Sequence, residues 1–162
     1  MTEKVKITDD VKKICIQIAR GYDRRVRNYY NRRCEIINGS SCSYIVIPDS
    51  AHPEDWTKTT WAYSTPAHNA QRTTENKAEQ LLALEKQPET LRMRAVENAQ
   101  ANVRPDLPQD LRQKLVKAIM QNCKSGKLFP YKVLDVDGFS ERGFYRERDD
   151  FLIDIAKFLD LF

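Results

Sequence analysis

The stretch GFSERGFYRERDDFLIDIAKFLDL, residues 138–161, combines a turn, a helix start and a regular apolar pattern. Ser140 closely follows Gly138, and its hydroxyl can accept a hydrogen bond from a backbone N–H that the first turn of a helix leaves free. Beyond it, large apolar residues recur at separations of seven, one, three and four, namely Phe144, Phe151, Leu152, Ile155 and Leu159. This pattern predicts a helix from about Glu141 to Leu159 that buries one face.

The opposite face of this predicted helix carries groups that suit a DNA groove. Arg142, Tyr145 and Arg146 point away from the apolar side. Arginine can donate two hydrogen bonds to O6 and N7 of guanine, and DNA-binding helices commonly present such side chains from their first turns. We therefore expect Arg142, Tyr145 and Arg146 to read or straddle the major groove. Glu141 joins this set of expected DNA-binding residues, and Ser140 would position the helix.

The same residues also fit a simpler explanation. Six acidic residues accompany four basic residues between positions 141 and 160, so a solvated surface with pairs such as Arg146–Asp150 would have a similar sequence. The residues alone therefore leave DNA binding and a charged solvent face equally open. Since the acids in the C-terminal half would repel phosphates, only the first two turns could approach DNA.

The residues before this helix predict the rest of a helix-turn-helix. Apolar residues at spacings of three and four indicate a helix that starts near Asp110 and stops at Ser125-Gly126. A short element around 131–134 and a turn at 137–138 follow, so residues 110–159 are predicted to form helix, short helix, turn, helix. Three lysines on the approach could bind phosphates without reading sequence: Lys124, Lys127 and Lys132.

A long helix is predicted near the N-terminal end. Apolar residues recur every three or four positions from residue 9 to residue 37, and Asp9 or Asp10 could cap the start. Asn38-Gly39 would end the helix. Gly21 costs about 1 kcal/mol relative to alanine in a helix interior, which favours a bend or a close packing contact there.

This predicted helix contains a strongly basic segment, RGYDRRVRNYYNRR at residues 20–33, with six arginines and one acid. In a continuous helix Arg24 and Arg27 share a face with Arg20. The face could bind phosphates, and Arg24 and Arg27 are therefore candidate DNA-binding residues. A charged solvent face and a dimerising helix are equally compatible with the segment.

Three segments follow from the pattern along the chain: a basic helix at 1–39, an irregular linker at 40–72 and a helical region at 73–162. The linker is rich in Ser, Thr, Pro and Asn, and its one strand-like piece is 44–47. Its Trp56, Trp61 and Tyr63 are costly to leave in water and would dock on the helices or on a partner. The helical region is interrupted by prolines at positions 88, 105 and 108. Since strands are almost absent from the pattern, the predicted class is all-α.

Composition excludes several other classes. The chain has 162 residues, which is enough for one domain or two small helical units. Its net charge is +4 and its mean hydropathy is -0.65. No apolar run approaches the roughly 18 residues of a membrane helix, and residues 1–6 lack the apolar region of a signal peptide. We therefore expect a soluble, cytoplasmic protein without a membrane partner.

Metal and catalytic chemistry are not expected. The four cysteines contain no CxxC pair and fit reduced, packed thiols, and a zinc site from Cys34, Cys42, His52 and His68 would match no common spacing. Both histidines fall in the predicted linker, and the chain lacks a Gly-rich phosphate loop, GxSxG and HExxH. The sequence therefore predicts no enzyme, no metal and no cofactor.

Residues 111–161 resemble the phage-encoded transcription regulators of the ArpU/RinA type; their sequence is LRQKLVKAIMQNCKSGKLFPYKVLDVDGFSERGFYRERDDFLIDIAKFLDL. Three further stretches are similar to the N-terminal and middle helices of that family: VRNYYNRRCEII, AEQLLALE and RMRAVENAQANV. The C-terminal ends of those regulators look like the DNA-binding region 4 of sigma factors. The resemblance implies a helix-turn-helix that activates late genes of a phage or prophage and contacts RNA polymerase.

The leading hypothesis is therefore a sequence-specific regulator that binds double-stranded DNA, with RNA polymerase and a second copy of the chain as further partners. A small terminase-like DNA-recognition subunit is a neighbouring alternative, which a ring of eight or more subunits would favour. A helical protein-interaction adaptor is the alternative from another class, and it predicts only weak, salt-sensitive attraction to DNA.

Overall fold

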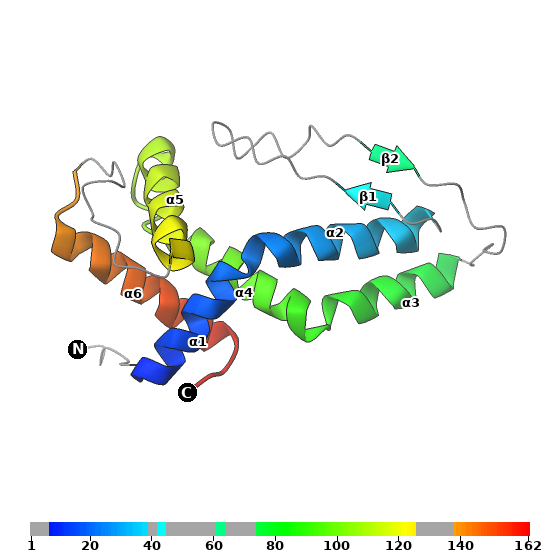
Figure 1. Cartoon of the computed structure of the whole chain (residues 1–162), viewed down its shortest axis with the longest axis horizontal. Helices are drawn as coiled ribbons and strands as arrows, with labels where there is room; N and C mark the ends of the chain where they lie inside the picture. Colours follow the sequence, from blue (N-terminus) through cyan, green and yellow to red (C-terminus); the bar gives the residue numbers. More distant parts are fainter. Residues whose placement is uncertain (1–6, 39–41, 45–60, 64–73, 126–137) are drawn as a thin grey trace. The chain divides into compact units, whose positions relative to one another are not determined.

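The computed structural model of the chain describes residues 7–38, 42–44, 61–63, 74–125 and 138–162. These residues form two compact units, one of Met1–Tyr22 with Arg92–Phe162 and one of Asp23–Leu91. The units differ from the predicted segments 1–39, 40–72 and 73–162, because helices far apart in the sequence pack together. The class is all-α, as the sequence predicts (Figure 1).

The N-terminal segment forms two helices where one is predicted, α1 (Asp9–Arg20) and α2 (Tyr22–Asn38). Gly21 lies between them, and its N–H donates to the Gln17 carbonyl at 3.1 Å. The prediction of one helix over 9–37 is therefore wrong at the residue with the lowest helix propensity in the segment.

The start of α1 also differs from the prediction. Thr8, in an extended conformation, accepts a hydrogen bond from the Val11 N–H at 3.4 Å and is the N-cap. Asp9 and Asp10 lie in the first turn, where their negative charges favour the positive end of the helix dipole. The acids predicted as caps therefore stabilise the same helix end in a different way.

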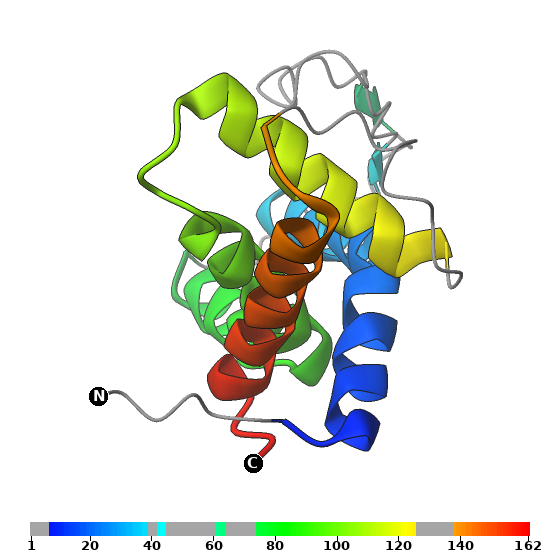
Figure 2. The ribbon, with the colours of Figure 1, turned by 90° about the vertical axis from the view of Figure 1, so that its left-hand side faces the viewer.

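The first unit contains α1, the later part of α4 (Pro88–Asn102), α5 (Gln109–Ser125) and α6 (Glu141–Phe158). Helix α1 packs against both α5 and α6 (Figure 2). The predicted apolar face of α6 is confirmed for four of its five residues, which are at most 2% exposed: Phe144, Phe151, Leu152 and Ile155. The fifth, Leu159, is the C-cap of the helix and is half-buried. They share the core with Cys15, Met93, Val96, Leu115 and Ile119.

Arg112 joins α5 to the end of α4. Its Nε donates to the Val103 carbonyl at 2.9 Å, and its Nη2 donates to the carbonyls of Ala101 and Gln100. These carbonyls lie where a helix end leaves its acceptors without partners and where a cation is favoured. Arg112 thus replaces the glycine cap that the chain lacks at this position.

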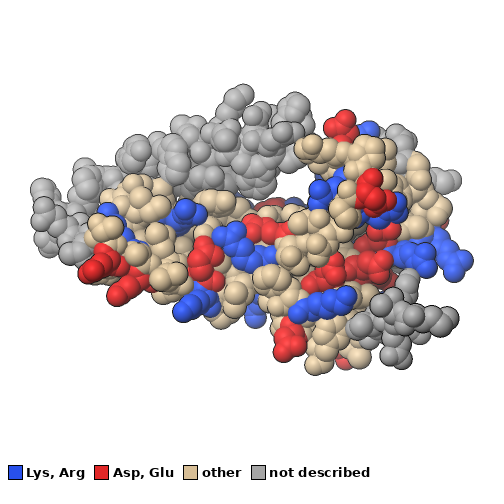
Figure 3. Space-filling model, turned by 180° about the vertical axis from the view of Figure 1, so that it is seen from behind, with Lys and Arg blue, Asp and Glu red and all other residues tan. Residues whose placement is uncertain are grey.

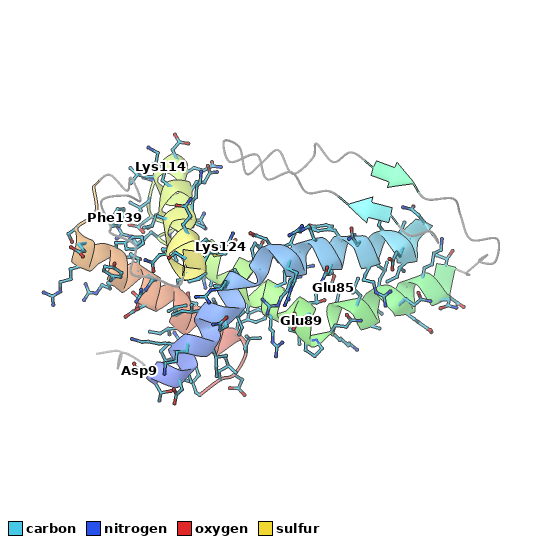
Figure 4. All side chains as sticks on the ribbon, in the orientation of Figure 1. Asp9, Glu85, Glu89, Lys114, Lys124 and Phe139 are labelled. Atoms are coloured by element: carbon cyan, nitrogen blue, oxygen red, sulfur yellow. The ribbon has the colours of Figure 1, made fainter. Side chains whose placement is uncertain are left out.

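The second unit contains α2 and α3 (Thr74–Glu85), which run antiparallel. Arg25 Nε lies 2.7 Å from Glu89 Oε2, and the Tyr29 hydroxyl donates to Glu85. Further along, Lys77 Nζ donates to the Ile37 carbonyl at 2.8 Å. As the chain advances along α2 from Arg25 to Ile37, the partner residues move back from Glu89 through Glu85 to Lys77. Figure 4 labels Glu85 and Glu89. The predicted interruption at Pro88 is confirmed, since α3 ends at Glu85 and α4 begins at Pro88.

Part of the predicted linker is regular. Strand β1 (Cys42–Tyr44) pairs antiparallel with β2 (Trp61–Tyr63), and Ser43 lies opposite Ala62. Of the strand-like piece predicted at 44–47, Tyr44 lies in β1, whereas 45–47 and Trp56 lie outside the described residues. None of the described helices is both long and apolar enough to cross a membrane.

Candidate nucleic-acid interface

The start of α6 is fixed by the local features that the sequence predicts. Gly138 adopts a φ of +83°, which favours glycine, and Ser140 is the N-cap, with its hydroxyl accepting from the Gly143 N–H at 3.1 Å. A Cβ at Gly143 would lie 3.1 Å from Ser140 Oγ, so the absence of a side chain there leaves room for the cap. The first turns of α6 are therefore set in one orientation.

Arg142 and Arg146 lie on the exposed side of these turns. Neither side chain makes a hydrogen bond or an ion pair with any residue that the structure describes. The pair Arg146–Asp150, which would make this a self-satisfied solvent face, is not formed. Within the described part of the chain, both guanidinium groups therefore lack an acceptor.

Tyr145 has a different environment from its neighbours. It is half-buried, its ring meets the Phe144 ring edge to face at a centroid distance of 5.5 Å, and the Arg148 guanidinium lies 5.0 Å from its centroid. Tyr145 thus flanks the two arginines while being packed on one side. Glu141 is exposed at the first position of the helix.

Half of the acidic residues between positions 141 and 160 are engaged within the unit. Glu147 accepts from Arg104 at 3.5 Å, Asp149 pairs with Lys12 at 3.4 Å, and Asp154 accepts from Asn102 at 3.2 Å. All three acids are partly buried. The negative charge that would oppose a phosphate backbone is therefore partly offset, and the remaining exposed acids are Glu141, Asp150 and Asp160.

Arg104 holds the loop after α4 against the beginning of α6. It has a φ of 36°, donates to both oxygens of Asp106 at 2.7 and 2.9 Å, and lies 5.9 Å from the Phe139 ring centroid. Its hydrogen bond lowers the pKa of Asp106 below the ordinary value and raises that of Arg104 itself. Sequence reasoning missed Arg104, because its partners lie up to 43 residues away.

Arg148 joins α6 to α5 in the interior. Its guanidinium donates to Asn122 Oδ1 and to Asp149 Oδ1, each at 3.1 Å. Two buried nitrogens in this contact, Asn122 Nδ2 and Arg148 Nε, have no hydrogen-bond partner among the described residues. Arg148 is therefore a packing residue, although it stands beside the exposed arginines in the sequence.

The other predicted DNA-binding residues fall into two groups. Lys124 is exposed in the last turn of α5, whereas Lys127, Lys132 and the predicted short helix lie in 126–137, outside the described residues. The arrangement helix, short helix, turn, helix is thus described only at its two ends, by α5 and α6.

Arg24 and Arg27 are exposed on α2, in the second unit. Arg20, predicted to share their face, lies on α1 in the first unit and donates to the Cys123 carbonyl at 3.5 Å. The basic face predicted for one continuous helix is therefore interrupted at Gly21. Arg24 and Arg27 lie together on α2, whereas Arg20 belongs to α1.

Three cysteines, Cys15, Cys34 and Cys123, are buried free thiols on helices, as predicted. Burial raises the pKa of Cys15 and of Cys123 to about 11. Within the described part of the chain no three His, Cys, Asp or Glu side chains could hold a metal ion. The side chains of Cys42, His52 and His68 lie outside that part.

Basic and acidic side chains are interspersed on the face drawn in Figure 3. This face therefore shows no cluster of one charge that would identify an interface, and the exposed arginines without partners among the described residues are the more informative feature. Comparison of the chain with protein-family models, with curated proteins and with solved structures finds no match.

Proposed function

We propose that the protein is a sequence-specific DNA-binding transcription regulator that reads its site with the first two turns of α6. The observation that carries this proposal is the state of Arg142 and Arg146. Both are exposed, both lack partners among the described residues, and both project from a capped helix start. Such an arrangement suits bidentate hydrogen bonds to guanine.

The spacing of the two arginines fits a base-paired duplex. Four residues of an α-helix span about 6 Å along its axis, and successive base pairs are about 3.4 Å apart. Arg142 and Arg146 could therefore address bases about two steps apart in a major groove that admits one helix. The tight fixing of α6 by Ser140, Arg104 and its buried face keeps the ordering cost of binding low.

The sequence resemblance of residues 111–161 supplies the biological part of the proposal. Regulators of that type act at late genes of phages and prophages, with RNA polymerase as partner. We place this chain in the same role, acting on double-stranded DNA near late promoters.

The test compares the double variant R142A/R146A with the unaltered protein on a duplex obtained by selection from random DNA. Each arginine that reads a base should contribute roughly 1–3 kcal/mol to binding that duplex. The control is K86A/K114A, which removes the same charge from exposed lysines that have no partner in the described chain. Since all four side chains are exposed, stability should change by less than about 0.5 kcal/mol.

The proposal requires that R142A/R146A lose its preference for the selected duplex over a scrambled one, while K86A/K114A keeps it. A folded R142A/R146A protein with full discrimination would contradict the assignment of these arginines. Binding that is weak, indifferent to sequence and abolished by salt in the unaltered protein would favour the adaptor.

A further inference from the structure

The second unit carries its own concentration of positive charge, and that charge lies on α2. Five of the helix residues are arginines, against two acids, Asp23 and Glu35. Arg25 is buried and paired with Glu89 at 2.7 Å, and Arg32 pairs with Glu35 at 3.1 Å. The remaining three form no hydrogen bond or ion pair in the described chain: Arg24, Arg27 and Arg33. The described residues thus neutralise only part of the charge on α2.

Two of these free arginines lie on the side of α2 that faces away from α3. Arg24, Arg27 and Asn28 are separated by three and four residues and are all exposed. Val26 and Tyr29 occupy the opposite side and are buried. We call the exposed set Arg24, Arg27 and Asn28 the α2 outer face.

The α2 outer face offers hydrogen-bond donors in a form that suits phosphates. Arginine donates through five N–H groups and the asparagine amide through two. Arg24 and Asn28 are one helical turn apart, about 6 Å along the axis. The acids of α2 itself are Asp23, at the edge of the face, and Glu35, whose carboxylate is paired with Arg32. A polyanion would therefore meet little opposing charge.

A protein partner fits this face less well. Stable protein interfaces are organised around buried aromatic or aliphatic anchors, with charged residues depleted from the centre. The α2 outer face has no such anchor, and the exposed apolar residues of α2, Tyr30 and Ile37, lie to one side of it. The exposed residues of α3 include the acids Glu75 and Glu79, and among the described residues of this unit all the arginines lie on α2.

We infer that the α2 outer face is a second DNA-binding surface, which binds the phosphate backbone of duplex DNA. This inference rests on the proposed function, because that function supplies the DNA. Contacts to phosphates fix and strengthen binding without carrying sequence information.

The test measures binding of R24A/R27A to the selected duplex and to a scrambled duplex by fluorescence anisotropy, between about 50 and 300 mM salt. Each phosphate contact contributes about 0.9 to the slope of log K against log salt concentration. The double variant should therefore lower the slope by about 1.8 and the affinity at 150 mM by about 30-fold, equally for both duplexes. R24K/R27K should retain most of the slope, and K86A/K114A should leave it unchanged.

The outcomes separate this inference from the proposed function. An unchanged salt slope for folded R24A/R27A overturns the inference, while loss of discrimination in R142A/R146A would still support base reading by α6. A lower slope in R24A/R27A together with full discrimination in R142A/R146A keeps the α2 outer face and removes the assignment of α6. If R24A/R27A instead changes the mass of the protein in light scattering and leaves the slope unchanged, the face binds a second copy and the inference fails.

Discussion

Replacing Ser140 by alanine removes the cap that sets the start of α6. The substitution deletes the hydrogen bond from the Gly143 N–H and leaves the buried face of the helix intact. Loss of a serine cap costs about 1 kcal/mol, which corresponds to a decrease of about 2–4 °C in Tm for a chain of this length. If this cost of about 1 kcal/mol falls on the first turn of α6, the equilibrium constant for opening that turn rises about 5-fold, since each 1.4 kcal/mol corresponds to a factor of ten. Thermal unfolding followed by circular dichroism measures the stability, and anisotropy measures binding.

The chain offers a matched control for this prediction. Thr8 caps α1 in the same way, by accepting from the Val11 N–H, yet α1 carries none of the proposed base-reading residues. T8A should lose stability comparably to S140A and keep its affinity for the selected duplex, whereas S140A should bind several-fold more weakly. S140T should behave like the unaltered protein. Equal affinities for S140A and T8A would refute the idea that the cap orders a DNA-reading turn.

Two further predictions concern the described core. R112A should lower the free energy of unfolding by about 1.5–3 kcal/mol, because the charged hydrogen-bond donor to the carbonyls at the end of α4 is lost. Urea denaturation measures this loss, and an unaltered free energy of unfolding would exclude a capping role for Arg112. The thiols of Cys15 and Cys123 have a pKa of 9.0 in the unfolded chain and of about 11 in the folded one. Because the unfolded state loses these protons first, the free energy of unfolding should fall as pH rises between these values. C15A/C123A should show a smaller loss between pH 8.5 and 10.5, and identical pH profiles would contradict this cause.

The features that the sequence predicts correctly depend on neighbours in the chain. The turn at Gly138, the cap at Ser140 and the buried face of α6 each follow from residues a few positions apart. The same holds for the interruption at Pro88 and for the end of α5 at Ser125. Local spacing and backbone preference are enough to place such elements.

The features that the sequence misses depend on distant partners. The predicted pair Arg146–Asp150 does not form, and the acids Glu147 and Asp149 are instead engaged by Arg104 and Lys12. No periodicity within α6 indicates those partners, because both come from other helices or loops. At Gly21 the sequence predicts only a bend or a close packing contact, because glycine lowers helix propensity without specifying a break.

The most direct test of the central claim is recovery of sheared DNA by the purified protein at about 150 mM salt, followed by sequencing of the retained fragments. The DNA should come from a phage or prophage host, and R142A/R146A should be carried through the same procedure. Reading by α6 predicts that one short site is enriched upstream of structural or packaging genes, and that the double variant loses this enrichment. Featureless retention that disappears as salt rises, the same for both proteins, would contradict it.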